Sequence, residues 1–468
     1  MNPLYKRARK AHFVGIGGVG MSGIAEILLA LGYQVSGSDL RASETTRRLE
    51  RLGARINYGH DERVITPDLD VVVISSAVRF SNPEVVRARE LKIPVIPRAE
   101  MLAELMRAKC GIAVAGTHGK TTTTSLIATV LSHAGLDPTV VIGGRVQALG
   151  TNAHLGNGEL MVAEADESDG TFLLLTPMLS VVTNIDPEHL DYYGDMERVR
   201  AAYLEFVNRV PFFGAAILCI DDPNVRALLP HVRKRVISYG TTSEAEYRAA
   251  NLRVKNLETR FEVFRNDQCL GELMVHLPGR HQALNALAAL AVGSELEVPF
   301  EVVRQALHSF SGIHRRFEIC GEADDVLVIS DYGHHPAEIA ATLAAAREGL
   351  GRRLVAVFQP HRYTRTRDLF SDFLTAFDTA DCLFLTDIYP AGEAPIEGVS
   401  GEALYQAFQR RGHMDVRFVP RLSEVVPAVL QEVRPGDAVL VLGAGNVHEV
   451  AVALVDHLQA RQPPLALH

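Results

Sequence analysis

Lys120 and Thr121 stand at the end of a turn with two glycines in the stretch AVAGTHGKTTTTS (113–125). The apolar residues before the turn predict a buried strand, and those after it predict a helix. Glycines let backbone N–H groups converge on an anion, and the helix N-terminus adds partial positive charge. Lys120 can supply a cation for the β- and γ-phosphates of a nucleotide, and Thr121 a hydroxyl for Mg²⁺. Although Val114 breaks the strict G-x-x-x-x-G-K-[ST] pattern, the turn predicts phosphate binding rather than a tight turn with a solvated lysine.

Two further groups downstream of this turn have the chemistry of Mg²⁺ ligands. Glu164, in MVAEADESDGTF, follows a short apolar run, which places its carboxylate at the end of a predicted strand. His189, in VVTNIDPEHLDYY, follows another apolar run, and neutral imidazole can ligate a divalent ion. Thr121, Glu164 and His189 are therefore the predicted metal ligands. An acidic loop and a capping or surface histidine are the alternatives for Glu164 and His189.

A second glycine turn lies nearer the N-terminus, in HFVGIGGVGMSGIAEILLALGYQVSGSD (12–39). Gly15, Gly17 and Gly20 fit the pattern G-x-G-x-x-G, and Asp39 follows at about the spacing of a ribose-binding acid. Taken alone, the stretch predicts an NAD site. The physical content of the pattern is narrower, because backbone N–H groups and a helix end specify a diphosphate and leave the rest of the ligand open.

Apolar runs and amphipathic helices alternate along nearly the whole chain, which predicts an α/β fold with parallel sheets covered on both faces. Residues 253–279 alternate instead and carry turn residues, which predicts an antiparallel insertion. Strand–turn–helix openings at three places predict domains at 1–107, 108–322 and 323–468. The predicted strands are the runs 71–75, 111–116, 179–185, 215–220, 326–330, 354–358, 382–387 and 438–445.

Composition excludes several classes of protein. A chain of 468 residues is too long for one core, and 47% hydrophobic and 22% charged residues are ordinary for a globular protein. A net charge of −9 without a basic block argues against nucleic-acid binding. Five scattered cysteines argue against a disulfide framework and for a cytoplasmic location. No apolar run predicts membrane insertion, and the glycine-rich stretch after YKRARK argues against a signal peptide.

Eight motifs in a fixed order make the chain similar to the Mur ligases, the ATP-dependent amide-forming enzymes of peptidoglycan precursor synthesis. The resemblance covers essentially the whole chain and is strongest to the alanine-adding branch. The motifs are GIGGVGMSGIAE, GTHGKTTTT, EADESD, TNIDPEHLDYYG, GRHQALNALAAL, GIHRRFE, DYGHHPAEI and FQPHRYTRT.

The resemblance implies three domains: a Rossmann-like N-terminal domain for the UDP-sugar, a central P-loop-type ATPase domain with a mostly parallel sheet, and a Rossmann-like C-terminal α/β domain for the amino acid. It implies the substrates UDP-N-acetylmuramate, L-alanine and ATP, with two Mg²⁺ ions, and either a monomer or a homodimer. The first glycine turn would then hold the diphosphate of UDP rather than NAD, and Asp39 would contact the uridine side.

The resemblance also implies roles for individual residues. His118 would meet the muramoyl end of the sugar, Asn285 would contact adenine, and Lys120, His189, His335 and His361 would be catalytic, the last two as candidates for taking the amine's proton. The implied ATP-binding residues are Gly116, Thr117, His118, Gly119, Lys120, Thr121, Thr122, Asn285, Arg316 and Asp331. The implied UDP-sugar-binding residues are Gly15, Gly17, Gly18, Gly20, Asp39, Ser75 and His118. The implied amino-acid-binding residues are Tyr332, His335, His361, Arg362 and Arg365, of which Arg362 and Arg365 would share one face if helical.

Two positions depart from the family pattern. Relatives that add later amino acids carry AAK with a carbamylated lysine, whereas this chain has AAY with Tyr203. Ser330 stands where an aspartate often precedes Asp-Tyr-Gly. Three readings compete with the alanine ligase: an NAD-dependent dehydrogenase fused to a kinase-like module, a ligase that adds a whole murein tripeptide, and a non-enzymatic nucleotide-binding regulator. A zinc site at DYGHHP is disfavoured, because adjacent histidines point in different directions.

Overall fold

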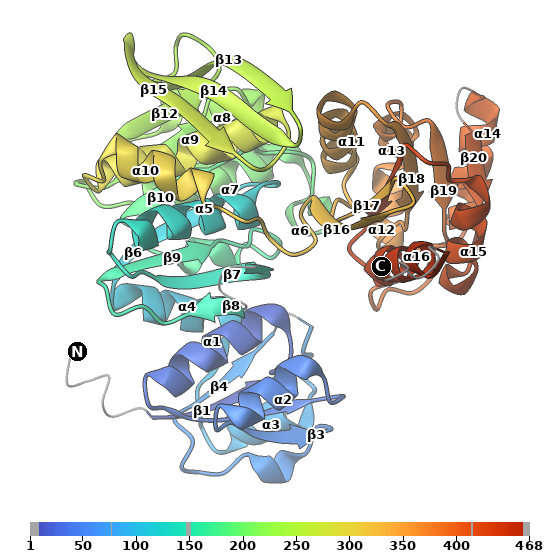
Figure 1. The fold of residues 1–468 in the computed structure, drawn as a ribbon. Helices are drawn as coiled ribbons and strands as arrows, with labels where there is room; N and C mark the ends of the chain where they lie inside the picture. The colour runs from blue at the N-terminus through green and yellow to red at the C-terminus, as the bar shows by residue number, and fades with distance from the viewer. Residues whose placement is uncertain (1–8, 76, 147–150, 413–414, 462–468) are drawn as a thin grey trace, which may run out of the picture. The chain divides into compact units, whose positions relative to one another are not determined.

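The computed structural model describes residues 9–75, 77–146, 151–412 and 415–461 (Figure 1). The chain divides into two compact units. Unit 1 holds the chain up to Ala250, together with Glu262–Leu273 and Leu284–Phe310. Unit 2 holds Asn251–Phe261, Met274–Ala283 and the chain from Ser311. Strands of the described residues form three sheets, which confirms the predicted α/β class.

The first sheet has five parallel strands in the order β3-β2-β1-β4-β5. Because β2 and β4 flank β1 on opposite sides, the chain reverses direction across the sheet at the carboxyl end of β1, where ligands bind in such folds. The strands are β1 (Lys10–Val14), β2 (Gln34–Asp39), β3 (Arg55–Tyr58), β4 (Val71–Ile74) and β5 (Val95–Pro97). The helices are α1 (Val19–Ala30), α2 (Glu44–Arg51), α3 (Pro83–Glu90) and α4 (Arg98–Arg107).

The second sheet has ten strands in the order β15-β14-β13-β12-β11-β10-β6-β9-β7-β8. Strand β6 pairs in parallel with both β10 and β9, so its carboxyl end is the second point of reversal. The strands are β6 (Cys110–Ala115), β7 (Thr139–Val146), β8 (Thr151–His154), β9 (Leu160–Glu164), β10 (Leu179–Val182), β11 (Ala215–Cys219), β12 (Val236–Gly240), β13 (Tyr247–Lys255), β14 (Glu258–Arg265) and β15 (Gln268–Val275). The helices are α5 (Lys120–His133), α6 (Leu190–Tyr193), α7 (Met196–Asn208), α8 (Pro223–Leu228), α9 (Arg280–Glu295) and α10 (Phe300–His308).

The predicted antiparallel insertion is confirmed by β13, β14 and β15. They are neighbours in the sheet and are joined by turns of two residues, which only antiparallel strands permit. Strand β12, which precedes them, still pairs with β13 in parallel. The insertion therefore extends the edge of the parallel sheet.

The third sheet has six strands in the order β16-β17-β21-β18-β19-β20, and β16 is the antiparallel edge strand. The strands are β16 (Glu318–Ala323), β17 (Val326–Asp331), β18 (Arg353–Phe358), β19 (Cys382–Leu385), β20 (Asp415–Phe418) and β21 (Asp437–Leu442). The helices are α11 (Pro336–Leu350), α12 (Tyr363–Asp368), α13 (Phe370–Ala376), α14 (Gly401–Arg411), α15 (Leu422–Glu432) and α16 (His448–Arg461). The predicted domain boundary at 322 falls within β16.

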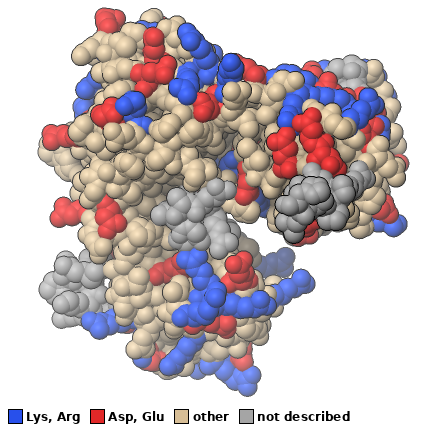
Figure 2. Space-filling model, viewed as in Figure 1, with Lys and Arg blue, Asp and Glu red and all other residues tan. Residues whose placement is uncertain are grey.

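The eight predicted strands are confirmed as β4, β6, β10, β11, β17, β18, β19 and β21. Most are buried along their whole length, since apolar side chains pack against helices on both faces. Among the helices that the structure describes, none has both the length and the apolar character that a membrane crossing requires. On the face in Figure 2, acidic and basic side chains are mixed within each part of the chain.

Candidate active site

The phosphate loop connects β6 to α5 and depends on two glycines with left-handed backbone. Gly116 has φ +138° and Gly119 has φ +78°, conformations that L side chains rarely adopt. A Cβ on Gly116 would lie 2.0 Å from Thr183 Oγ1, and one on Gly119 would lie 2.9 Å from Asn285 Oδ1. Both positions therefore need glycine, because the backbone conformation disfavours any other residue and because there is no room for a Cβ.

The loop that follows β10 holds the phosphate loop in place through direct hydrogen bonds. The backbone N–H of His118 donates to Asn184 Oδ1 at 2.8 Å, and Asn184 Nδ2 donates back to the carbonyl of His118 at 3.0 Å. Thr183 Oγ1 donates to the same carbonyl at 2.6 Å, and the N–H of Asp186 donates to Thr117 Oγ1 at 2.8 Å. Thr183, Asn184 and Asp186 were not predicted as site residues, although all lie within the TNID segment of a predicted motif.

Lys120 lies partly buried at the start of α5, between the loop and a carboxylate. Its Nζ donates to the carbonyls of Gly116 and Thr117, at 2.6 and 3.1 Å, and to Glu167 Oε1 at 2.9 Å. Burial would lower the pKa of Lys120, but the carboxylates of Glu167 and Glu164 raise it above its ordinary value. The ammonium group is therefore fully charged at neutral pH.

Thr121 and Glu164 meet beside this lysine. Thr121 Oγ1 donates to Glu164 Oε2 at 3.0 Å, and the backbone N–H of Gly143 donates to the same oxygen at 2.9 Å. Glu164 is the last residue of β9, which pairs with β6 directly. Neighbouring strand ends thus bring together the predicted hydroxyl and carboxylate ligands, two oxygen donors of the kind that Mg²⁺ prefers.

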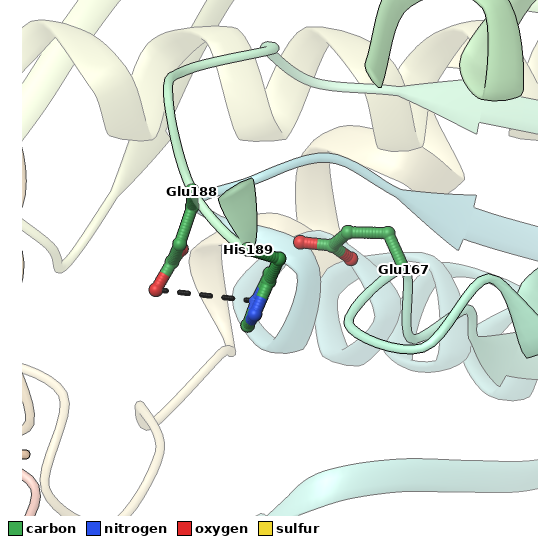
Figure 3. A group of neighbouring side chains, drawn as sticks. All are labelled: Glu167, Glu188 and His189. Atoms are coloured by element: carbon green, nitrogen blue, oxygen red, sulfur yellow. Dashed lines mark ion pairs between the residues drawn. The ribbon is translucent and has the colours of Figure 1, made fainter. Parts of the chain in front are cut away.

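His189 lies in a separate group, with two acids that the sequence reasoning did not assign (Figure 3). One ligand atom each of Glu167, Glu188 and His189 lies within 4.8 Å of the others. Burial raises the pKa of Glu167 to about 7, although Lys120 opposes the shift, and its buried Oε2 has no hydrogen-bond partner. An unpaired buried carboxylate oxygen facing a carboxylate and an imidazole fits a divalent cation.

Three other residues surround the phosphate loop. Asn285, on α9, is buried. It accepts a hydrogen bond at 3.1 Å from Oγ1 of Thr123, which lies in α5 after Gly119. His118 Nε2 lies 2.9 Å from Asp186 Oδ2. Tyr203, on α7, is buried at the AAY position, where relatives that add later amino acids are expected to carry a lysine. Its phenol cannot carry a carbamate.

The first glycine turn follows β1 and is braced from β2. The N–H groups of Gly15 and Ile16 donate to the carbonyl of Ser38, at 2.8 and 3.0 Å. The N–H of Gly17 donates to Asp39 Oδ2 at 2.8 Å. In this structure the acid at the ribose-binding position therefore supports the turn itself, and its uridine-side role stays a prediction. Ser75 lies 3.5 Å from where a Cβ on Gly15 would be.

In unit 2, several predicted site residues surround the start of α11. The Asp331 carboxylate accepts hydrogen bonds from the N–H groups of Phe317 and Gly333, at 2.8 and 2.7 Å. Arg316 lies over the ring of Tyr332, 5.1 Å from its centroid. His335 is the buried N-cap of α11, and its Nδ1 accepts from the N–H of Ala337 at 3.3 Å. Asp331 thus holds backbone groups here, and its predicted contact with ATP stays a prediction.

The structure corrects one expectation about the two arginines of FQPHRYTRT. Arg365 lies within α12, but Arg362 precedes the helix as its N-cap with φ +72°, so the two do not share a helix face. The cause is a contact with a distant part of the chain: the N–H of Arg362 donates to the carbonyl of Tyr389 at 2.9 Å, which holds a left-handed residue before the helix. Arg362 Nε lies 3.1 Å from Glu393 Oε1.

His361 is held neutral by its surroundings. Burial lowers its pKa to about 3, and the positive charge of Arg365 acts in the same direction. Arg365 Nη1 lies 3.2 Å from Nδ1, and the ring stacks on Tyr389 with centroids 5.5 Å apart. A ring of such low proton affinity is a poor acceptor for the amine's proton, which argues against His361 as the base. His335 already accepts the N–H of Ala337 at Nδ1, so its role as the base stays a prediction.

We expect the His361 ring to stay unprotonated through pH 5, whereas an exposed histidine titrates near its ordinary pKa of about 6.5. The folded pKa lies below the unfolded one, so folding stability should fall as the pH drops from the unfolded value toward 3. Nitrogen-15 NMR of the histidine rings, assigned with His361→Asn, measures this directly. A titration of His361 near pH 6.5 would contradict the expectation.

Comparison with known proteins shows which family the chain belongs to. Three Mur ligase models match the chain: the family's catalytic domain at residues 10–110, the middle domain at 114–293 and the glutamate ligase domain at 315–445. A UDP-N-acetylmuramate–L-alanine ligase of Anaeromyxobacter sp. (strain Fw109-5) is 58% identical over 98% of this chain and 100% of its own. The chain belongs to the Mur ligase family.

Further Mur ligases agree in sequence and in fold. A UDP-N-acetylmuramate–L-alanine ligase of Myxococcus xanthus (strain DK1622) is 56% identical over 98% of this chain and 97% of its own. The crystal structure of a UDP-N-acetylmuramate–alanine ligase from Thermotoga maritima has a TM-score of 0.82 and 31% identity, over 97% of this chain and 100% of its own. A murein peptide ligase of Psychrobacter arcticus, with a TM-score of 0.70 and 24% identity over 97% and 100%, shares the fold.

Proposed function

We propose that the chain is an ATP-dependent ligase that joins L-alanine to the lactyl carboxylate of UDP-N-acetylmuramate. The products are UDP-N-acetylmuramoyl-L-alanine, ADP and phosphate, in peptidoglycan precursor synthesis. The observation that carries the proposal is the partly buried Lys120 at the end of the phosphate loop, beside the oxygen atoms of Thr121, Glu164 and Glu167. The whole-length relatives named as alanine ligases support L-alanine over a tripeptide as the acceptor.

The reaction needs activation, because a carboxylate oxygen is a poor leaving group toward an amine. The lactyl carboxylate attacks the γ-phosphorus of ATP, so that a carboxylate–phosphorus bond forms and the bond to ADP breaks. The amine of L-alanine then attacks the acyl phosphate carbon, loses a proton and expels phosphate. Holding the three substrates together contributes roughly 7–11 kcal/mol in well-oriented intramolecular reactions.

The residues of the phosphate loop offset the repulsion between the lactyl carboxylate and the γ-phosphate of ATP, which are both negatively charged. Lys120 places a fixed positive charge at the loop, where it stabilises charge on the transferring phosphoryl group. The backbone N–H groups at the start of α5 would face bound phosphates without reorganisation. Mg²⁺, when bound by Thr121 and Glu164 or by Glu167, Glu188 and His189, would neutralise phosphate charge. We assign two ions because the donors form two separate groups.

We assign the UDP-sugar to residues 1–107, ATP to 108–322 and the amino acid to 323–468. In the last domain, Arg365 and Arg362 offer guanidinium groups for the α-carboxylate of alanine. Free thiols at all five cysteines and the use of ATP support a cytoplasmic reaction.

Phosphate release with UDP-N-acetylmuramate, ATP, Mg²⁺ and L-alanine, each omitted in turn, tests the proposal. We expect release only when all four are present. Release that persists without the UDP-sugar or without the amino acid would sink the assignment. A kinetic comparison of L-alanine with murein tripeptide separates the two family activities, and L-alanine should give the higher kcat/KM.

A further inference from the structure

A fully buried carboxylate lies inside the first domain, and the proposed reaction gives it no role. Glu84, in the first turn of α3, has no exposed surface. Its Oε2 accepts hydrogen bonds from Ser38 Oγ at 2.7 Å and from His12 Nε2 at 3.1 Å. Its Oε1 accepts from the backbone N–H of Asp61 at 3.1 Å and lies 3.3 Å from His60 Nδ1.

These donors replace the water that a buried carboxylate loses. Burial alone would raise the pKa of Glu84, but the hydrogen bonds from His12 and Ser38 hold it below its ordinary value, so the side chain is ionised. The donors come from β1, β2 and the segment after β3. Glu84 therefore joins three neighbouring strands of the first sheet near their carboxyl ends.

Ser38 connects this network to the glycine turn. Its hydroxyl donates to Glu84, and its carbonyl accepts the N–H groups of Gly15 and Ile16, at 2.8 and 3.0 Å. The next residue, Asp39, accepts the N–H of Gly17 at 2.8 Å. A shift of Ser38 would therefore move both supports of the turn together.

His12 supports the turn from the other strand. It lies in β1, shortly before Gly15, and its Nδ1 lies 2.9 Å from Ser36 Oγ in β2. The ring thus bridges Glu84 on one side and β2 on the other. Strand β1 leads into the glycine turn, and β2 ends beside it, so the network holds the strand before the turn and the strand that braces it.

We propose that Glu84 is a positioning residue for the diphosphate of the UDP-sugar. It acts through Ser38 and His12, and does not itself touch the substrate. The inference rests on the proposed function, in which the glycine turn binds the UDP part of UDP-N-acetylmuramate. A carboxylate with only a structural role would affect the stability of the domain. Its loss would not weaken the binding of UDP-N-acetylmuramate more than the binding of ATP or L-alanine.

The test is Glu84→Gln, which keeps the volume and replaces one acceptor oxygen by an N–H₂ group facing donors. Hydrogen bonds to buried charged groups contribute about 1.5–3 kcal/mol, so we expect the KM for UDP-N-acetylmuramate and the Kd of UDP to rise about tenfold or more. The KM values for ATP and L-alanine, and kcat at saturation, should stay within about twofold, below the size of one hydrogen bond. Steady-state kinetics and UDP calorimetry measure these quantities.

Two further variants make the result decisive. Ser38→Ala removes only the hydroxyl that links Glu84 to the turn, and should give the same selective rise even where Glu84→Gln folds poorly. Glu26→Gln is the matched control: this carboxylate on α1 pairs with Arg48 at 2.9 Å, outside the network of Glu84, and its loss should leave the KM for the UDP-sugar unchanged.

The outcomes separate this inference from the proposed function. If the wild-type protein binds no UDP, the proposed ligand of the turn is wrong and the inference falls with it. If the wild-type protein binds UDP and both network variants bind it equally well, only the positioning role is wrong. A similar rise in all three KM values, together with a lower melting temperature, would also overturn the positioning role, because this outcome indicates general damage to the fold.

Discussion

Replacing Lys120 with methionine is expected to lower kcat by about a hundred- to a thousandfold, the range seen when one preorganised charge-stabilising group is removed. Methionine keeps an unbranched side chain of similar length but carries no charge. The variant leaves the carboxylate of Glu167, which now receives a hydrogen bond from Nζ at 2.9 Å, without its cation. Transfer of the γ-phosphoryl group should therefore fail, while the proposed amino-acid-binding residues of unit 2 are unchanged. Single-turnover formation of ADP measures the loss.

Lys109→Met is the matched control for this prediction. Lys109 is also partly buried, and its Nζ donates to the carbonyls of Gly156 and Gly158, at 2.8 and 2.7 Å, away from the phosphate loop. It should lose some stability and keep the wild-type kcat. Calorimetry with L-alanine and thermal unfolding of both variants show whether Lys120→Met is folded. A folded Lys120→Met protein with kcat within a few-fold of wild type would rule out the assigned role of this lysine.

The sequence predicted the ends of buried strands well, because strand, turn and helix have distinct local patterns. Lys120, Thr121 and Glu164 follow such ends, and neighbouring parallel strands bring those ends together. The loops were harder to predict. EADESD and DPEH hold several acids each, and which of them faces Lys120 or His189 depends on the path of the chain. Glu167 and Glu188 were missed for this reason, because neither stands at the end of a strand.

Left-handed residues explain the remaining differences. His189 has φ +57° and Arg362 has φ +72°; histidine adopts this conformation more often than most residues, but neither residue type alone predicts it. At Arg362 it is fixed by a hydrogen bond to Tyr389, far along the chain, so the helix begins one residue later than a shared face of two arginines would require. Asp39 illustrates the same limit, since the spacing places an acid beside the turn but does not reveal that it accepts the N–H of Gly17.

Replacing Gly116 with alanine is expected to abolish ATP binding and to lower the melting temperature by several degrees, because two costs act together. The backbone has φ +138°, where an alanine is strained by at least about 1–2 kcal/mol. The new Cβ would also lie 2.0 Å from Thr183 Oγ1 and 3.1 Å from the backbone nitrogen of Thr183. Since Thr183 donates to the carbonyl of His118, moving it releases the brace of the phosphate loop.

Gly135→Ala separates the cost of backbone strain from the cost of the steric clash with Thr183. Gly135 follows the other end of α5 with φ +76°, and a Cβ there meets nothing within 4 Å, so only the backbone cost applies and ATP binding should be unchanged. Adding Thr183→Ala to Gly116→Ala removes the closest approach but keeps the strain and the contact with the backbone nitrogen. The double variant should therefore regain stability only in part and should still bind ATP poorly. Calorimetry with a non-hydrolysable ATP analogue decides the point: wild-type affinity in Gly116→Ala would mean that ATP does not bind at this loop.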